Sequence, residues 1–145
     1  MIALDSTSGY LPEGVHVLTF EECRRHFAWN ARRRFLFDGL ARALANLEAA
    51  GCRSVLIDGS FITAKTLPND WDAAFDPVGV MADRVDPILL KHDDGRRAMR
   101  AKYLGDMFPW TSSAAANGPL YRQFFQKDRD GNPKGIVEIK LQAVQ

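Results

Sequence analysis

Apolar residues recur with helical spacing in the first third of the chain. Four leucines lie four, four and three residues apart, which places them on one face of an α-helix: Leu36, Leu40, Leu44 and Leu47. Asn30 precedes this segment and Gly51 follows it. An asparagine side chain caps the first turn of a helix well, and glycine readily adopts the left-handed conformation that ends one. The spacing therefore predicts a helix over residues 30–50.

Thr19 and Glu22 predict a shorter helix before this one. A threonine followed three residues later by a glutamate fits a capping box, in which each side chain accepts a hydrogen bond from a backbone amide at the helix start. Apolar residues with helical spacing follow: Phe20, Cys23 and Phe27. We expect this helix to end at about residue 28. Residues 1–14 hold glycine, serine and proline but few large apolar side chains, so we expect an irregular arm.

Four short apolar segments predict strands, at residues 54–58, 71–75, 102–110 and 136–141. The first is a continuous apolar run between two glycines, which is typical of a buried strand. The last alternates apolar and polar residues, so we expect it to be half-exposed. Further helical segments are expected after Asp86-Pro87, at residues 96–103, and as one or two turns near Leu120, Phe124 and Phe125.

The order of these elements predicts an α/β fold, a small mixed β-sheet with flanking helices and the helix 30–50 packed on one face. The chain has 145 residues, 46% hydrophobic and 26% charged, so we expect a single domain over residues 1–145. Nineteen Lys and Arg against 18 Asp and Glu argue against nucleic-acid binding through bulk charge alone. No apolar run approaches the roughly 20 residues that span a membrane, and residues 1–9 lack the pattern of a signal peptide. We therefore expect a cytoplasmic protein without a membrane segment.

The candidate chemistry lies between the first two predicted strands. Gly59 and Ser60 follow the first strand, and Asp70 and Asp72 stand at the start of the second. A glycine at a strand end lets a phosphate approach the backbone, and a serine offers it an amide and a hydroxyl. Residues two apart in a strand share a face, so the two carboxylates would repel each other unless a cation lay between them. Mg²⁺ prefers carboxylate and phosphate oxygens, so the pattern predicts a Mg²⁺-dependent phosphate site.

This pattern resembles the signature of the nucleotidyltransferase superfamily, the fold of polymerase beta and of the minimal nucleotidyltransferases. That signature is a hydrophobic strand, Gly-Ser, and then Asp-hydrophobic-Asp on the adjacent strand. The chain also looks like a bacterial branch of the superfamily in the run from Asp58 to Asp70, in Leu11-Pro-Glu-Gly14, and in Phe124-Phe-Gln126 with Lys134-Gly-Ile136. The resemblance implies an enzyme that transfers a nucleoside monophosphate from an NTP to a hydroxyl of a protein, a tRNA or a small molecule. It implies Mg²⁺ or Mn²⁺ as cofactor and a place in a toxin-antitoxin or phage-defence module.

The resemblance also implies roles for particular residues. Asp70 and Asp72 would hold the metal, Gly59 and Ser60 would bind the phosphates, and Lys65 would reach a β- or γ-phosphate. Active members carry a third carboxylate on a later strand, as a metal ligand or general base. Asp106 on the third predicted strand is the candidate. Glu138 on the last strand is its competitor, although its position favours the exposed side of an edge strand.

Two departures and one alternative bear on this interpretation. Asp58 stands where the superfamily usually has a hydrophobic residue, so it either faces away or adds negative charge to the phosphate site. A chain this short has little room for a domain that shapes the acceptor site, which suggests a partner chain or a homodimer. The alternative function is a catalytically silent antitoxin or regulatory binding protein with the same fold.

Clusters of basic residues allow two interpretations, a patch for a polyanionic acceptor such as tRNA or a solvated helix face. The first comprises Arg32, Arg33 and Arg34 near the start of the long predicted helix, together with Arg24, Arg25 and Arg42. The second comprises Arg96, Arg97, Arg100 and Lys102. The solvated face is the favoured interpretation for both clusters.

Overall fold

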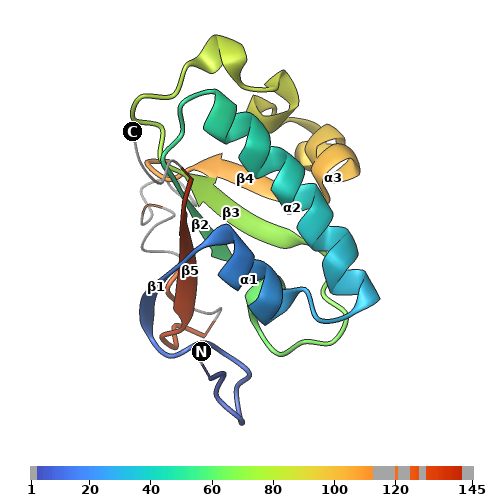
Figure 1. Ribbon diagram of the computed structural model, residues 1–145, viewed down its shortest axis with the longest axis vertical. Helices are drawn as coiled ribbons and strands as arrows, with labels where there is room; N and C mark the ends of the chain where they lie inside the picture. The colour runs from blue at the N-terminus through green and yellow to red at the C-terminus, as the bar shows by residue number, and fades with distance from the viewer. Residues whose placement is uncertain (1–2, 113–119, 121–124, 128–129, 142–145) are drawn as a thin grey trace.

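The computed structural model describes residues 3–112, 120, 125–127 and 130–141. It has an α/β fold in which a five-stranded mixed sheet carries helices on one face (Figure 1). The elements follow the chain as β1 (Gly14–Leu18), α1 (Phe20–Phe27), α2 (Ala31–Ala49), β2 (Ser54–Asp58), β3 (Trp71–Phe75), α3 (Arg97–Tyr103), β4 (Gly105–Pro109) and β5 (Gly135–Lys140). The strand order in the sheet is β1-β5-β2-β3-β4.

The sheet mixes parallel and antiparallel pairs. The two outer pairs, β1 with β5 and β3 with β4, are parallel. The two inner pairs, β5 with β2 and β2 with β3, are antiparallel. The predicted small mixed sheet with flanking helices is therefore confirmed at the level of architecture.

Local signals in the sequence place both N-terminal helices correctly. The Thr19 side chain accepts a hydrogen bond from the Glu22 amide, and the Glu22 carboxylate accepts one from the Thr19 amide, which completes the capping box of α1. The Asn30 side chain accepts from the Arg33 amide and caps α2. Each cap satisfies amides that the first turn of a helix leaves without an intrahelical partner.

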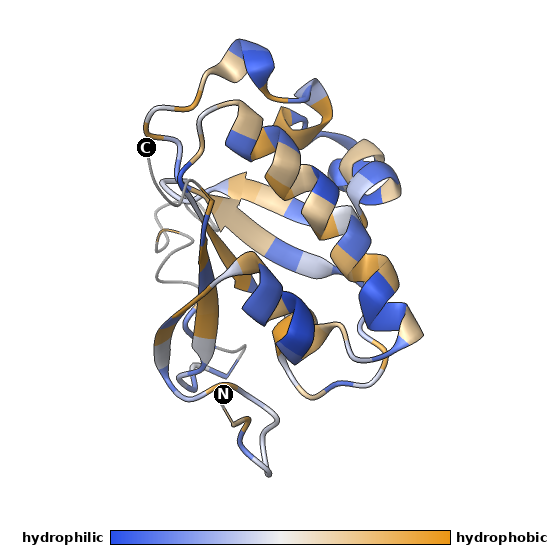
Figure 2. Cartoon of the chain, viewed as in Figure 1, coloured by the Kyte–Doolittle hydropathy of each residue, from blue (hydrophilic) through white to orange (hydrophobic). Residues whose placement is uncertain are grey.

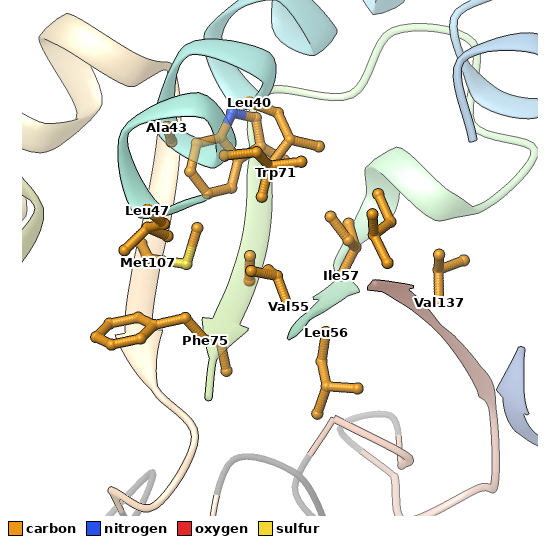
Figure 3. Packing of buried hydrophobic residues seen from close by; sticks show 14 of the residues in the cluster. Leu40, Ala43, Leu47, Val55, Leu56, Ile57, Trp71, Phe75, Met107 and Val137 are labelled. Carbon is orange, nitrogen blue, oxygen red and sulfur yellow. The ribbon is translucent and has the colours of Figure 1, made fainter. Parts of the chain in front are cut away.

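The core lies between α2 and the sheet. Three alternate residues of β3 are buried: Trp71, Ala73 and Phe75. Trp71 and Phe75 lie on the side of the sheet that faces α2, where Leu40 and Leu47 of that helix are found (Figure 3). Leu56 of β2 points to the opposite face of the sheet and is also buried (Figure 3). Colouring by hydropathy shows polar positions at the start of β3 and of β4 and apolar ones farther along both strands (Figure 2). The polar starts of these two strands are where the candidate site lies.

β1 was not predicted, and β5 was predicted at nearly the right residues but with the wrong exposure. Residues 14–18 form a strand that pairs with β5 in parallel, so the irregular arm ends where β1 begins. The last strand was expected to be half-exposed, but it lies between β1 and β2, and five of its six residues are buried. The prediction was wrong because the alternation of Ile136, Val137 and Glu138 says nothing about which strands become neighbours.

Smaller differences concern the second half of the chain. Asp86 does cap the segment after it, accepting from the Ile88 amide, but Pro87–Leu90 is a 3₁₀ turn. The third predicted strand begins only at Gly105, because α3 continues to Tyr103 and Leu104 ends it in a left-handed conformation. The helical turns expected near residues 120–125 fall largely outside the described residues.

Candidate functional site

Three carboxylates stand in register on adjacent strands. Asp58 of β2 lies opposite Asp72 of β3, and Asp72 lies beside Asp106 of β4. Because side chains of paired residues project to the same face, and Trp71 and Ala73 point toward α2, all three acids project away from α2. Asp70 directly precedes β3 rather than lying within it. The structure thus brings four acids together at the end of β2 and the starts of β3 and β4.

An open cleft of about 910 Å³ gathers most of the predicted site residues. Its lining includes five of the six predicted site residues: Gly59, Ser60, Lys65, Asp70 and Asp72. The lining also includes four residues that were not among the predicted site residues: Tyr10, Lys127, Asp130 and Lys134. Tyr10 belongs to the N-terminal arm, which the Ala64 amide holds in place by donating to the Gly9 carbonyl at 3.0 Å. Asp106, the sixth predicted residue, lies next to Asp72 on β4.

The two central acids, Asp70 and Asp72, both have raised pKa values. Burial, followed by the charges of Asp70, Asp106 and Asp58, raises the pKa of Asp72 to about 7. Burial and the charge of Asp106 also raise the pKa of Asp70. Within the part of the chain that the structure describes, neither carboxylate has a cation within ion-pair distance. The predicted repulsion between Asp70 and Asp72 is therefore present in the folded protein.

Asp106 is compensated by two arginines of the α3 segment. Arg100 donates two hydrogen bonds to its carboxylate, at 2.8 and 2.7 Å, and Arg96 Nε lies 3.2 Å from its Oδ1. Burial by itself would raise the pKa of Asp106, but the hydrogen bonds from Arg100 and the positive charge of Arg96 hold it below the usual value. Arg96 and Arg100 are thus tied to a buried acid, although Arg100 remains exposed to solvent as predicted.

The negative charge of Asp58 is balanced by a lysine next to β5. Lys134, which directly precedes β5, places its Nζ 2.8 Å from Asp58 Oδ1, and both side chains are largely buried. Burial nevertheless raises the pKa of Asp58, against the opposing influence of Lys134. Asp58 therefore does not face away from the site but adds an acid to it together with its own cation. Lys134 stands in one of the segments that resemble the bacterial branch, which was the only sequence signal for it.

Glu138 lies outside this arrangement. It is 5% exposed on a central strand, accepts a hydrogen bond from Ser54 Oγ, and pairs with Lys140 at 2.9 Å. The expectation of an exposed edge residue is wrong, because β1 covers the outer edge of β5. Glu138 lies opposite Leu56 in the sheet register, which is two residues before Asp58 along β2 and therefore away from the acids at the end of that strand.

Some of the acids in this cluster are suited to binding a hard divalent cation. For the described residues, no group of three or more His, Cys, Asp and Glu side chains is arranged to hold a metal ion by itself. Mg²⁺ commonly takes only one or two carboxylates and completes its shell with water and substrate phosphate. Asp70 and Asp72 fit that requirement. Asp106 fits it less well in this arrangement, because its negative charge is already balanced by Arg100 and Arg96.

The arginine cluster at the start of α2 is not a solvated patch. Arg33 is fully buried, and Arg32 donates to the carbonyls of Pro68 and Asn69 at 2.9 and 2.7 Å. Both side chains therefore hold the segment between β2 and β3, which carries Lys65 and leads to Asp70. Arg34 remains exposed.

Comparisons with known proteins place the chain in one family. Residues 2–140 match a family model described as "Family of unknown function (DUF6932)". No curated protein and no solved structure matches the chain. Among the helices that the structure describes, none is both long and apolar enough to cross a membrane.

Proposed function

We propose that this chain, which belongs to the DUF6932 family, is a divalent-metal-dependent nucleotidyltransferase with its active site in the cleft at the end of β2 and the start of β3. It would transfer a nucleoside monophosphate from an NTP to a hydroxyl of a protein, a tRNA or a small molecule. A cytoplasmic location and a place in a toxin-antitoxin or phage-defence module belong to the same proposal. The observation that carries it is the gathering of Gly59, Ser60, Lys65, Asp70 and Asp72 around one cleft.

The distribution of charge supports a single divalent cation at the centre of the acid row. The outer acids already have fixed partners, Lys134 for Asp58 and Arg100 for Asp106. Asp70 and Asp72 have none among the described residues, so these two would hold Mg²⁺ or Mn²⁺. When bound, the metal would neutralise charge on the entering and leaving oxygens of the phosphoryl transfer.

Lysines that line the cleft support a polyphosphate as the ligand. Lys65, Lys127 and Lys134 lie around the same opening as Ser60. Their ammonium groups would make charge-assisted hydrogen bonds to the β- and γ-phosphates, and the Ser60 hydroxyl would contact a phosphate oxygen. This would orient the α-phosphate toward Asp70 and Asp72.

The transfer step would proceed by displacement at the α-phosphorus. The acceptor oxygen forms the new bond to phosphorus, the bond to the β-phosphate oxygen breaks, and pyrophosphate leaves with that electron pair. The acceptor proton must go to a base. Asp106 is the predicted base, although its hydrogen bonds from Arg100 lower its pKa and so make it a weaker base.

The test is transfer of label from α-³²P NTPs in the presence of Mg²⁺ and a cell extract. Wild-type protein should label a protein or RNA band, and Asp72→Asn should lower the rate at least about a hundredfold, since the lost metal interaction is worth several kcal/mol of barrier. Asp83→Asn, on an exposed acid distant in sequence from the site, is the matched control and should keep full activity. Labelling that survives in Asp72→Asn would contradict the proposal.

The second candidate function is a silent nucleotide-binding regulator. The double hydrogen bond between Arg100 and Asp106 favours it, because this pair withholds the predicted base from an acceptor. A regulator would bind Mg²⁺-NTP without transferring label. It would co-purify with one stoichiometric partner chain, and such a result would replace the enzyme proposal.

A further inference from the structure

Arg33 is a fully buried cation behind the cleft. Its guanidinium donates hydrogen bonds to the carbonyl oxygens of five residues: Phe27, Ser60, Phe61, Thr63 and Lys65. Four of these lie in the short segment from Ser60 to Lys65, and three of those four residues line the cleft. One side chain of α2 thus fixes the path of the loop that follows Gly59.

The geometry of the guanidinium explains why an arginine stands there. Its planar fork offers five N–H donors in fixed directions, whereas a lysine ammonium offers three on a flexible stem. The Nε donor reaches the Lys65 carbonyl at 3.1 Å, and one Nη1 donor reaches the Phe27 carbonyl at 2.9 Å. Because trans peptides are planar, a carbonyl turned toward Arg33 turns the following amide away from it. Arg33 thereby sets the orientation of successive peptide groups in the loop.

The charge of Arg33 is not cancelled by an acid. Every acceptor that the described residues provide to it is a neutral carbonyl oxygen. Its guanidinium also lies over the rings of Trp29 and Phe61, at 4.8 and 5.4 Å. Buried charges in proteins are normally paired with an opposite charge or a metal, because desolvation makes an isolated ion costly. The loop that Arg33 holds lines an open cleft. An anionic ligand in that cleft would supply the opposite charge that Arg33 lacks.

We propose that Arg33 is a positioning residue for the phosphate chain of the ligand. It holds the Ser60–Lys65 loop in the shape that binds phosphate, and its buried charge attracts the anion across the loop. The ligand class is an inorganic or nucleoside polyphosphate. This inference rests on the proposed function for the location of the phosphates, but it concerns binding and not transfer.

The test measures binding of inorganic tripolyphosphate and of Mn²⁺ by calorimetry. Arg33→Lys keeps the charge but loses the fork, and it should weaken tripolyphosphate binding about tenfold or more. Its Mn²⁺ affinity should stay within about twofold of wild type, because Asp70 and Asp72 do not contact Arg33. The matched control is Arg42→Lys on the same helix, where the side chain donates one hydrogen bond to the Lys102 carbonyl. It should change neither affinity.

An equal loss of tripolyphosphate and Mn²⁺ binding in Arg33→Lys would reduce Arg33 to a purely structural role and overturn the proposal. Unchanged tripolyphosphate binding would overturn it as well. If the variant does not fold, the Arg33 Nε–H resonance of the wild type provides a second measurement. It should shift and exchange more slowly with water when tripolyphosphate binds, and an unperturbed resonance at saturation would overturn the proposal.

The outcomes separate this inference from the proposed enzyme. Tripolyphosphate binding that depends on Arg33, without any transfer of label, would refute the transferase and leave the role of Arg33 intact. Transfer of label with wild-type phosphate affinity in Arg33→Lys would do the reverse. A wild-type protein that binds neither tripolyphosphate nor any NTP would refute both.

Discussion

The Cα atom of Gly59 lies against the carboxylate of Asp72. A Cβ at Gly59 would stand 2.6 Å from Asp72 Oδ2, and Gly59 has a φ of +86°, which side chains rarely tolerate. Both constraints require glycine at this position. The close approach links the two halves of the Gly-Ser and Asp-x-Asp pattern, because the turn after β2 forms one side of the pocket around the acid on β3.

Gly59→Ala should therefore damage both stability and binding. The backbone conformation and the contact with Asp72 together should cost about 1–3 kcal/mol of unfolding free energy, and Asp72 should be displaced. Urea denaturation and Mn²⁺ calorimetry measure the two effects. Gly95→Ala is the control, since Gly95 also has a positive φ but a Cβ there would meet no atom within 4 Å. Equal loss of Mn²⁺ affinity in both variants would contradict the contact argument.

Asp72→Asn should stabilise the protein above neutral pH. The pKa of Asp72 is raised from 3.8 to about 7, so between these values the folded state holds a proton that the unfolded chain releases. Wild-type stability should thus fall as pH rises from about 4 to about 7, whereas Asn carries no such charge. We expect a gain on the order of 2 kcal/mol in Asp72→Asn at pH 8 and almost none at pH 4. Denaturation curves at both pH values test this. A gain that does not change with pH would contradict it.

Divalent cation binding should weaken as pH falls through about 7. Asp72 must be ionised to bind a cation, so each pH unit below its pKa of about 7 should lower the Mn²⁺ affinity by about tenfold. Calorimetric titrations at pH 6, 7 and 8 measure the slope. Both Asp70→Asn and Asp72→Asn should lose binding, while Asp83→Asn should behave as wild type. Affinity that stays constant between pH 6 and 8 would exclude Asp72 as a ligand.

Arg100→Met should lower the stability of the protein, because it removes most of the positive charge that balances the buried Asp106. Asp106 is 3% exposed, so losing two hydrogen bonds should cost about 1–3 kcal/mol of unfolding free energy. Adding Asp106→Asn to Arg100→Met should recover part of the loss, because no buried charge then remains. Arg97→Met is the control, since Arg97 pairs with Asp94 on the surface. A double variant as unstable as the sum of the single variants would show that the pair is not coupled.

The same variants address the roles proposed for the site. If Asp106 is held as a fixed anion and is not a metal ligand, Asp106→Asn should bind about as much Mn²⁺ as wild type, with one ion per chain. Two ions in Arg100→Met would show that releasing Asp106 opens a second metal site. Loss of the single ion in Asp106→Asn would make Asp106 a ligand, as the sequence resemblance implies.

The sequence by itself determined the helices and strands whose formation depends on residues close together in the chain. The Thr19 and Glu22 capping box, the Asn30 cap and the leucine spacing place α1 and α2, since caps and helical faces form between residues three or four apart. The apolar runs place β2 and β3 at the predicted residues. The Gly59-Ser60 turn, Asp70 and Asp72 were also expected in one site, because their pattern resembles a known signature, and the pairing of β2 with β3 brings them together.

Only the tertiary structure decided which side chains compensate the acids. Lys134 reaches Asp58 because β5 inserts between β1 and β2, and no local pattern encodes that neighbour. Arg33 appeared as one of three consecutive surface arginines, yet it is buried because it meets the Lys65 carbonyl 32 residues farther along the chain. Such contacts depend on strand order and on the packing of α2, which follow from the burial of apolar surface by the whole chain. The sequence identified the acids, whereas the fold determined which of them remain available to a ligand.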